Sequence, residues 1–318
     1  MINRILNEMK DKLKSSDLKA LEKVLKKYLS NEKKDENRQE NNAKLVQEFI
    51  ANKKFEGCSN KTIEQYEYNV GKFLSDIGKA AVDVNKNDIK GYLAKYQSTH
   101  DVSNVTINNM LRYITSFFNY LENEEIILLN PARKIKSIKT EKVIKKPLSD
   151  VEVEELRQST TNLRDMAIIE VLYATGIRVS ELCQLNRTDI KNDMAVVKGK
   201  GSKERKIYFS QKSMYYLNQY LQSRKDTNEA LFVGLKKPYT RISVECVETI
   251  CRTLGKVAEV EKVHPHRFRR TMATRALNKG MPIQEVQMLL GHSKIDTTMI
   301  YCSVDEDNIK LSHKKYVA

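Results

Sequence analysis

The chain has 318 residues, of which 40% are hydrophobic and 31% are charged. This length favours about two domains, and the apolar content excludes a wholly disordered chain. Its 56 lysines and arginines outnumber 41 aspartates and glutamates, which gives a formal net charge of +15. Such a surplus favours a polyanionic partner, above all nucleic acid, because phosphate backbones attract cationic surfaces and release counterions on binding.

The sequence predicts a protein without a membrane segment. Its apolar runs, such as residues 126–129, fall far short of the roughly 20 residues that span a bilayer. The amino terminus, MINRILNEMKDKLK, lacks the apolar core of a secretory signal. The five cysteines form no C-x-x-C pair. We therefore expect a cytoplasmic protein with reduced, mostly packed cysteines.

Residues 1–40 are predicted to be an amphipathic helical extension. Apolar residues recur there at spacings of three and four, which is typical of a narrow helical stripe. The run NEKKDENRQENN at the end of this region is predicted to be a solvated linker. The extension either solubilises the chain and docks on it, or contacts DNA or a partner.

Residues 41–138 are predicted to form a compact helical domain. Four helical segments are expected, at roughly 43–55, 60–76, 86–97 and 104–123, with turn-forming stretches between them. The stretch from 135 to 147 is basic, lacks an apolar face and ends in a proline. Its second part, residues 139–147, is the predicted linker between domains.

Residues 148–318 are predicted to form a second domain of mixed structure. Ser149 is expected to cap a helix with acidic residues in its first turn. Runs at 194–199 and 206–210, separated by a turn rich in lysine and glycine, predict a β-hairpin. Further helices are expected at 163–174, 178–185, 212–223, 242–259, 266–278 and 282–290.

Two arginines are candidates for phosphate binding. Arg178 follows a predicted helix stop, where its fork of donors can project into a cleft. The alternative is an ordinary salt bridge to Glu181 on the same helix face. His266 and Arg269 lie three residues apart on a predicted helix, so both leave the same face and suit a phosphate. The alternative for this pair is a plain basic helix face.

Three other polar side chains each allow more than one interpretation. His264 and His266 lack a second pair of ligands at metal-binding spacing, so we expect no metal site. His292 stands in the turn after a helix that ends at Gly291, and Tyr301 follows shortly after. The tyrosine is either a core residue that pairs with the histidine or an activated oxygen nucleophile.

Taken together and in order, these segments resemble the tyrosine recombinases of the phage integrase and Xer type. The resemblance rests on ATGIRVSEL, GKGSKER, PHRFRRTMAT and LLGHS followed by TTMIY. It implies a mainly α fold with a small β-hairpin: an N-terminal helical, SAM-like core-binding domain, then an α+β catalytic domain. Residues 1–40 fall outside the usual pattern of the family.

The resemblance also implies DNA cleavage and rejoining through a covalent 3′-phosphotyrosyl intermediate, without cofactor or metal. It assigns Tyr301 as nucleophile, Arg178 and Arg269 as the phosphate clamp, and Lys200 as general acid to the 5′ oxygen. It places His266 and His292 as supporting acid/base and hydrogen-bonding groups. These roles agree with the physics of phosphoryl transfer, because fixed cationic donors stabilise charge that develops on the non-bridging oxygens.

The expected partners are double-stranded DNA and further copies of the chain. Side chains expected to contact DNA are Lys61, Arg112, Lys203, Arg205 and Arg270. Arg270 stands where the family often has a histidine, and we interpret it as an added phosphate contact. In the family the tail after the tyrosine often docks on a neighbouring subunit, which predicts a DNA-bound tetramer with tail exchange. Accessory DNA-bending proteins or a sister recombinase are possible additional partners.

Several functions remain open at the level of sequence. A mobile-element integrase or excisionase is favoured over an Xer-like chromosome dimer resolvase, because the amino-terminal extension is extra for a minimal Xer-type protein. A non-catalytic DNA-binding relative would lack one of the two arginines or the tyrosine, and all three are present. A metal-dependent nuclease would need a carboxylate cluster, whereas the acidic residues are scattered.

Overall fold

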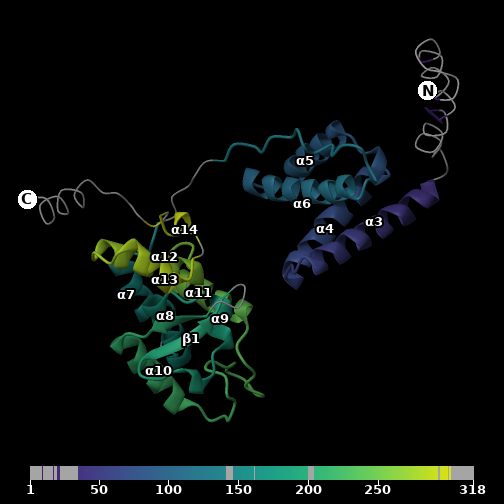
Figure 1. The fold of residues 1–318 in the computed structure, drawn as a ribbon. Coiled ribbons are helices and arrows are strands. Elements are labelled where there is room, and N and C mark those ends of the chain that lie inside the picture. Colours follow the sequence, from purple (N-terminus) through teal and green to yellow (C-terminus); the bar gives the residue numbers. More distant parts are fainter. Residues whose placement is uncertain are drawn as a thin grey trace, which may run out of the picture. The chain divides into compact units, whose positions relative to one another are not determined.

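The structure is a computed structural model that describes residues 9, 17, 20–21, 35–140, 146–160, 162–199, 204–292, 294–299 and 301, with side chains masked for 35–40. It divides into two compact units, residues 1–142 and 143–318 (Figure 1). Its described part is mainly helical with one two-stranded sheet, which confirms the predicted fold class. No helix among the described residues is long and apolar enough to cross a membrane.

The first unit is a helical bundle around an aromatic core. Its elements are α3 (Asp35–Phe55), α4 (Asn60–Ile77), η1 (Ala81–Asp83), α5 (Lys86–His100) and α6 (Asn104–Asn123). Phe49 of α3 meets Phe117 of α6 edge to face, with 5.4 Å between ring centroids. Phe73 of α4 packs in the same way on Tyr92 of α5. Aromatic contacts of this geometry tie all four helices into one core.

The predicted solvated linker before the first unit is wrong over residues 35–42, because α3 already begins at Asp35. This stretch reads DENRQENN and has no apolar stripe. Glutamate, glutamine and arginine nevertheless have high intrinsic helix propensity. A helical end of this composition therefore escapes a prediction based on hydrophobic periodicity alone.

The end of the first unit is held against α6 by two asparagines. Asn108 Nδ2 donates to Ile138 O and its Oδ1 accepts from Ile138 N, both at 2.8 Å. Asn104 Nδ2 donates to Lys139 O at 3.3 Å. The basic stretch is thus part of this unit as far as residue 139, and residues 141–145 lie outside the described residues.

The second unit is built around the buried helix α8. Its elements are α7 (Asp150–Gln158), α8 (Leu163–Thr175), α9 (Val179–Gln184), η2 (Arg187–Asp189), β1 (Met194–Lys198), β2 (Glu204–Tyr208), α10 (Gln211–Ser223), α11 (Val244–Val257), α12 (Pro265–Asn278), α13 (Ile283–Leu290) and α14 (Asp296–Met299). Helices α10 and α12 pack on α8. Ser149 caps α7 in a capping box with Glu152, as predicted.

The predicted hairpin is present, but its second strand starts earlier than expected. β1 and β2 pair antiparallel, with Val197 opposite Arg205 and Ala195 opposite Ile207. The charged pair Glu204 and Arg205 therefore belongs to β2, where the sequence predicted a turn. Successive side chains of a strand alternate between its faces, and Arg205 shares the inward face with Ile207.

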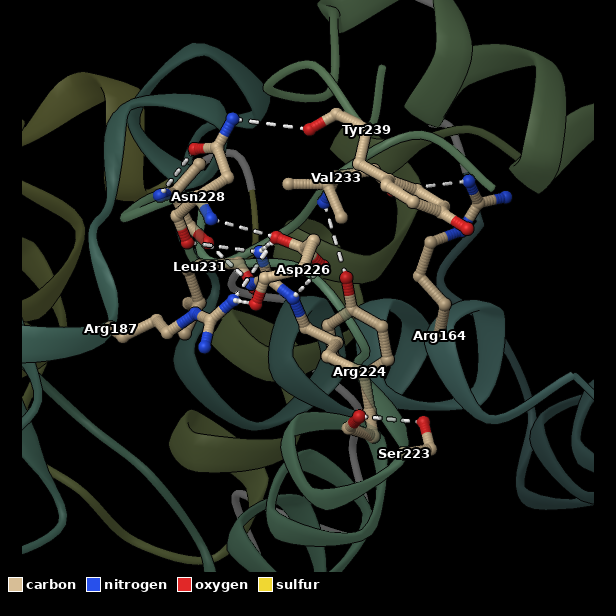
Figure 2. A network of polar contacts seen from close by, with 11 residues as sticks. Arg164, Arg187, Ser223, Arg224, Asp226, Asn228, Leu231, Val233 and Tyr239 are labelled. Carbon is tan, nitrogen blue, oxygen red and sulfur yellow. Dashed lines mark hydrogen bonds and ion pairs between the residues drawn. The ribbon is translucent and has the colours of Figure 1, made fainter. Parts of the chain in front are cut away.

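A polar network fixes the irregular segment between α10 and α11 (Figure 2). Arg224 and Arg187 both donate to the carboxylate of Asp226, which is 9% exposed. The hydrogen bond from Arg224 is the largest of the effects that lower the pKa of Asp226 to about 2. Asn228 Nδ2 donates to Tyr239 O across the segment. These contacts hold the segment that leads from α10 to α11, and α11 borders the candidate site.

Candidate active site

Two arginines that are far apart in the sequence converge on the turn after α13. Arg178 is the N-cap residue of α9, and its Nη2 donates to Gly291 O at 3.1 Å. Arg269 of α12 donates from Nη2 to Leu290 O and from Nη1 to Gly176 O. These acceptors lie at the C-terminal ends of α8 and α13, where free carbonyls and the helix dipole favour positive charge.

The chain conformation at the end of α8 makes this convergence possible. Gly176 ends α8 with a φ of +59°, a conformation that disfavours any residue with a side chain. A Cβ at this position would lie 2.4 Å from Cε of Met272 in α12. The left-handed turn at this glycine ends α8 beside α12, where Arg269 bonds the carbonyl of Gly176 itself.

Arg178 makes the predicted salt bridge and still leaves part of its side chain exposed. Its Nη1 bonds Oε1 of Glu181 at 2.9 Å, which is the predicted ordinary salt bridge. Its side chain is nevertheless 35% exposed and lines a cavity of about 500 Å³ together with His266 and Arg269. One edge of the guanidinium is thus held by the carboxylate while the residue still faces the cavity.

Arg269 is a buried cation in a cationic environment. It is 2% exposed, and burial, followed by the charges of Arg178 and Arg205, lowers its pKa to about 10. The guanidinium therefore stays protonated at neutral pH. His266 lies on the same face of α12 but is exposed, so it stands at the rim of the cavity with the arginine deeper inside.

Glu181 is a buried carboxylate that the sequence marked only as a salt-bridge partner of Arg178. Its carboxylate is 3% exposed and accepts from Arg178 and, through both oxygens at 2.7 Å, from Arg205. Burial by itself raises the pKa of Glu181, but the hydrogen bonds from the two arginines outweigh it and the net pKa is lowered. Two arginines thus share a single ionised carboxylate, and the charges of all three groups act on nearby Arg269. The local surplus of positive charge suits a phosphate.

Arg205 was expected to contact DNA, and the structure places it inside the protein instead. Its side chain is 8% exposed, its Nε donates to Leu289 O at 2.8 Å, and its two terminal nitrogens bond Glu181. Burial of every second residue of β2 puts Arg205 on the inward face. That alternation, with Ile207 and Phe209 also buried, is the sequence signal that identifies it.

His292 is held as a neutral ring by its two neighbours. Its Nε2 lies 3.1 Å from Nη2 of Arg269, and its Nδ1 lies 2.9 Å from Oγ1 of Thr298. An arginine can only donate, so Nε2 is the acceptor and the ring proton resides on Nδ1, which donates to the threonine. Burial, then the charges of Arg269 and Arg178, lowers the pKa of His292 to about 4.

We expect a titration of His292 by NMR to show this depressed pKa in the DNA-free protein. Because the unfolded chain has the ordinary histidine pKa of 6.5, it binds the proton first as the pH falls. Unfolding measurements should therefore show a loss of stability between pH 6.5 and about 4 that His292→Gln reduces. A ring that titrates near 6.5 in the folded protein would contradict the assigned environment.

Tyr301 is packed beside the arginine cluster. It is 4% exposed and joins a small core of α12 and α13 side chains, Ala273, Val286 and Leu290. Its ring centroid is 6.0 Å from that of His292. The core interpretation of this tyrosine thus describes its packing, while its proximity to Arg269 and His292 keeps it close to the phosphate-binding groups.

Arg270 was expected to add a phosphate contact, and this role stays a prediction. Burial lowers the pKa of Arg270 and the charge of nearby Tyr301 opposes that shift, so this arginine lies close to the tyrosine. Arg270 is 8% exposed, and its Nη1 donates to Lys146 O at 3.3 Å. Adjacent residues of a helix project in directions about 100° apart, so Arg270 leaves a different face of α12 from Arg269. It fixes the chain that enters the second unit.

The remaining predicted residues fall in three places. Lys61 on α4 and Arg112 on α6 are exposed in the first unit, and the guanidinium of Arg112 lies 5.5 Å from the ring centroid of Tyr113. Lys200 and Lys203 lie outside the described residues, as does the tail after Tyr301. The structure leaves the predicted roles of all these residues as predictions.

His264, which we considered and rejected as a metal ligand, caps a helix in the structure. His264 is the N-cap of α12, and its Nδ1 accepts from the backbone N–H of Arg267 at 3.2 Å. Among the described residues, no three His, Cys, Asp or Glu side chains are grouped so that they could hold a metal ion. The histidine pair around Pro265 therefore starts a helix.

Both units match models of known protein families. Residues 146–308 match the model of the phage integrase family, and residues 45–128 match that of its N-terminal SAM-like domain. The tyrosine recombinase XerA of Pyrococcus horikoshii is 31% identical over 280 residues, which cover 86% of this chain and 94% of that protein. XerC of Leptospira interrogans is 31% identical over 291 residues, covering 87% and 94% of the two chains.

Solved structures share the fold at lower identity. The Tn1549 transposon integrase in complex with a circular intermediate DNA has a TM-score of 0.70 at 19% identity, covering 85% of this chain and 98% of that one. A lambda integrase dimer bound to a COC′ core site has a TM-score of 0.69 at 17% identity, covering 81% and 94%.

Proposed function

Since the chain belongs to the phage integrase family of tyrosine recombinases, we propose that it cleaves and rejoins duplex DNA through a 3′-phosphotyrosyl bond to Tyr301. The observation that carries the proposal is the cavity at Arg178, His266 and Arg269, with His292 bonded to the deeper arginine and Tyr301 beside His292. The two arginines come from separate elements, α9 and α12, and meet at this cavity.

The reaction follows from the charges of this cluster. The Tyr301 oxygen attacks phosphorus, its proton passes to a base, and the bond from phosphorus to the 5′ oxygen breaks. Arg178 and Arg269 stabilise the charge that grows on the non-bridging oxygens, an effect of about 10² to 10³ in rate for a well-placed donor. Family resemblance assigns Lys200 to protonate the departing 5′ oxygen. The reverse attack by a 5′ hydroxyl rejoins a strand and releases the tyrosine.

The biological setting that we propose is integration or excision of a mobile element. The extension before the first unit, which exceeds a minimal Xer-type protein, supports this setting, and the fold shared with a transposon integrase agrees with it. The alternative is resolution of chromosome dimers, favoured by the 31% identity to XerA and XerC proteins. The DNA attached to the protein distinguishes the two.

The test is recovery of protein-linked DNA from cells that express the wild-type chain or Tyr301→Phe, lysed directly into denaturant. We expect a denaturant-resistant adduct with the wild type only, because phenylalanine preserves the packing of the ring and removes the nucleophilic oxygen. Attached sequences at the ends of an element support the mobile-element role, and a single chromosomal site supports dimer resolution. An equal adduct with the Phe variant would place the nucleophile elsewhere.

We also propose that the enzyme works as a DNA-bound tetramer that exchanges C-terminal tails, with double-stranded DNA as its partner. A groove of about 1550 Å³ borders the site, with Met272, Met281 and Met288 among its lining residues. Its methionines suit apolar anchors such as Ile309 and Leu311 of the tail. Accessory DNA-bending proteins or a sister recombinase belong to the same proposal.

Deleting the residues after Val304 tests whether the tail is needed to assemble the tetramer. We expect the truncated chain to bind single sites and form the adduct, but to lose the tetrameric complex of two duplexes in a gel-shift or sedimentation experiment. Tetramers that form at wild-type concentration without the tail would refute exchange.

A further inference from the structure

Helix α11 brings two exposed side chains of opposite charge to the cavity of the candidate active site. Glu248 and Arg252 lie four residues apart, so both project from one face of the helix. Both line the cavity of about 500 Å³ that also contains Arg178, His266 and Arg269. A duplex whose phosphate binds the arginines would therefore lie next to this face of α11.

The orientation of this face is fixed by the rest of the helix. Ser243 caps α11 by accepting from the backbone N–H of Cys246. The opposite side of the helix buries Val247, Ile250, Cys251 and Leu254 in the core of the second unit. Because this packing prevents rotation of α11, Glu248 and Arg252 are presented in a set direction.

The side chains of Glu248 and Arg252 make no ion pair or hydrogen bond with any residue that the structure describes. Glutamate and arginine at this spacing on a helix surface commonly pair with each other. Here both stay available to a ligand, although four other described arginines of the second unit hold carboxylates three residues away or nearer in sequence.

The side chains of Arg252 and Glu248 suit different parts of DNA. Arg252 extends the cationic surface around the bound phosphate, which suits the phosphate of a neighbouring nucleotide. A carboxylate in the same place repels phosphates and needs a hydrogen-bond donor. In the major groove the donors are the amino groups of cytosine and adenine, and a carboxylate typically accepts from N4 of cytosine.

We propose that Glu248 is a specificity-determining residue that accepts a hydrogen bond from the amino group of a cytosine near the scissile phosphate, and that Arg252 contacts an adjacent phosphate. This assignment rests on the proposed function, since the cavity must hold the scissile phosphate. Glu248 would then make a base-specific contact, and Arg252 a phosphate contact that does not depend on the DNA sequence.

The test is selection of bound duplexes from a library of random sequence by the full-length chain, comparing wild type, Glu248→Gln and Glu155→Gln. Glutamine has nearly the same shape but pairs with adenine. We expect one position of the selected site to change from cytosine to adenine, with a change in preference of about 5- to 100-fold. Glu155 is exposed on α7 and lines none of the cavities described above, so its variant should select the wild-type site.

Arg252→Ala gives the complementary result. It should weaken binding to all sequences alike and reduce the dependence of log K on log salt by about 1, as loss of one phosphate contact does. If Glu248→Gln selects the same bases as wild type at every position, the assignment is overturned, while an adduct between wild type and its selected duplex still upholds the proposed function. If wild type enriches no sequence and forms no adduct, both fail.

Discussion

Replacing Arg178 by lysine is expected to slow DNA cleavage by about 10²- to 10³-fold without unfolding the protein. The guanidinium bonds Glu181 and Gly291 O with one side and faces the cavity with another, and an ammonium group cannot span these positions. The side chain is 35% exposed, so the core does not depend on it. The measurement is the single-turnover rate of adduct formation on the DNA recovered with the wild-type protein.

Arg133→Lys is the matched control for this variant. Arg133 is also an arginine paired with a glutamate, Glu122, but its side chain is 68% exposed and it lies in the first unit. We expect the adduct to form at nearly the wild-type rate, because exposed ion pairs contribute little. Cleavage by Arg178→Lys at the wild-type rate would remove Arg178 from the phosphate clamp.

Replacing Glu181 by glutamine is expected to lower the free energy of unfolding by about 3–5 kcal/mol, because it leaves two arginines without their buried counter-charge. The carboxylate is 3% exposed and accepts from Arg178 and Arg205. Urea unfolding at pH 7 measures the effect. The same change should also slow cleavage, since both arginines lose the group that orients them.

Glu154→Gln serves as the control for the stability measurement. Glu154 also pairs with an arginine, Arg157, but its side chain is 55% exposed, so we expect a change below about 1 kcal/mol. The pH dependence gives a second check. The pKa of Glu181 is held below its ordinary value of 4.5, so its contribution is present above that pH and is lost as the pH falls further. Equal stability of Glu181→Gln and wild type at pH 7 would refute the role of Glu181 as the buried counter-charge of Arg178 and Arg205.

The helices of this protein are largely readable from its sequence, because the information is local. Caps such as Ser149 and the helix stop at Gly176 follow from the hydrogen-bonding needs of helix ends. The family and the enzyme class are likewise confirmed, since the arginine, histidine and tyrosine motifs occur in the expected order. Where prediction failed locally, as at the start of α3, the segment is a helix whose sequence has no apolar stripe.

Local sequence patterns could not show which residues become neighbours in the folded protein. From the sequence we expected Arg205 and Arg270 to contact DNA. In the structure both side chains are buried: Arg205 bonds Glu181, and Arg270 bonds Lys146 O. Both are long side chains whose direction depends on the face that their strand or helix buries. The importance of Glu181 has the same origin, because a carboxylate that looks like one partner of Arg178 becomes the shared counter-charge of two arginines.

The chemical groups could be read from the chain alone: a tyrosine, two arginines and two histidines stand in an order that identifies a family of DNA recombinases. Which positive charges line the cavity and which are buried in the fold became visible only in three dimensions. Side-chain chemistry is a property of each residue, whereas burial, pKa and hydrogen bonding depend on neighbours that the chain brings together from distant positions. The neutral ring of His292 between Arg269 and Thr298 is the clearest instance.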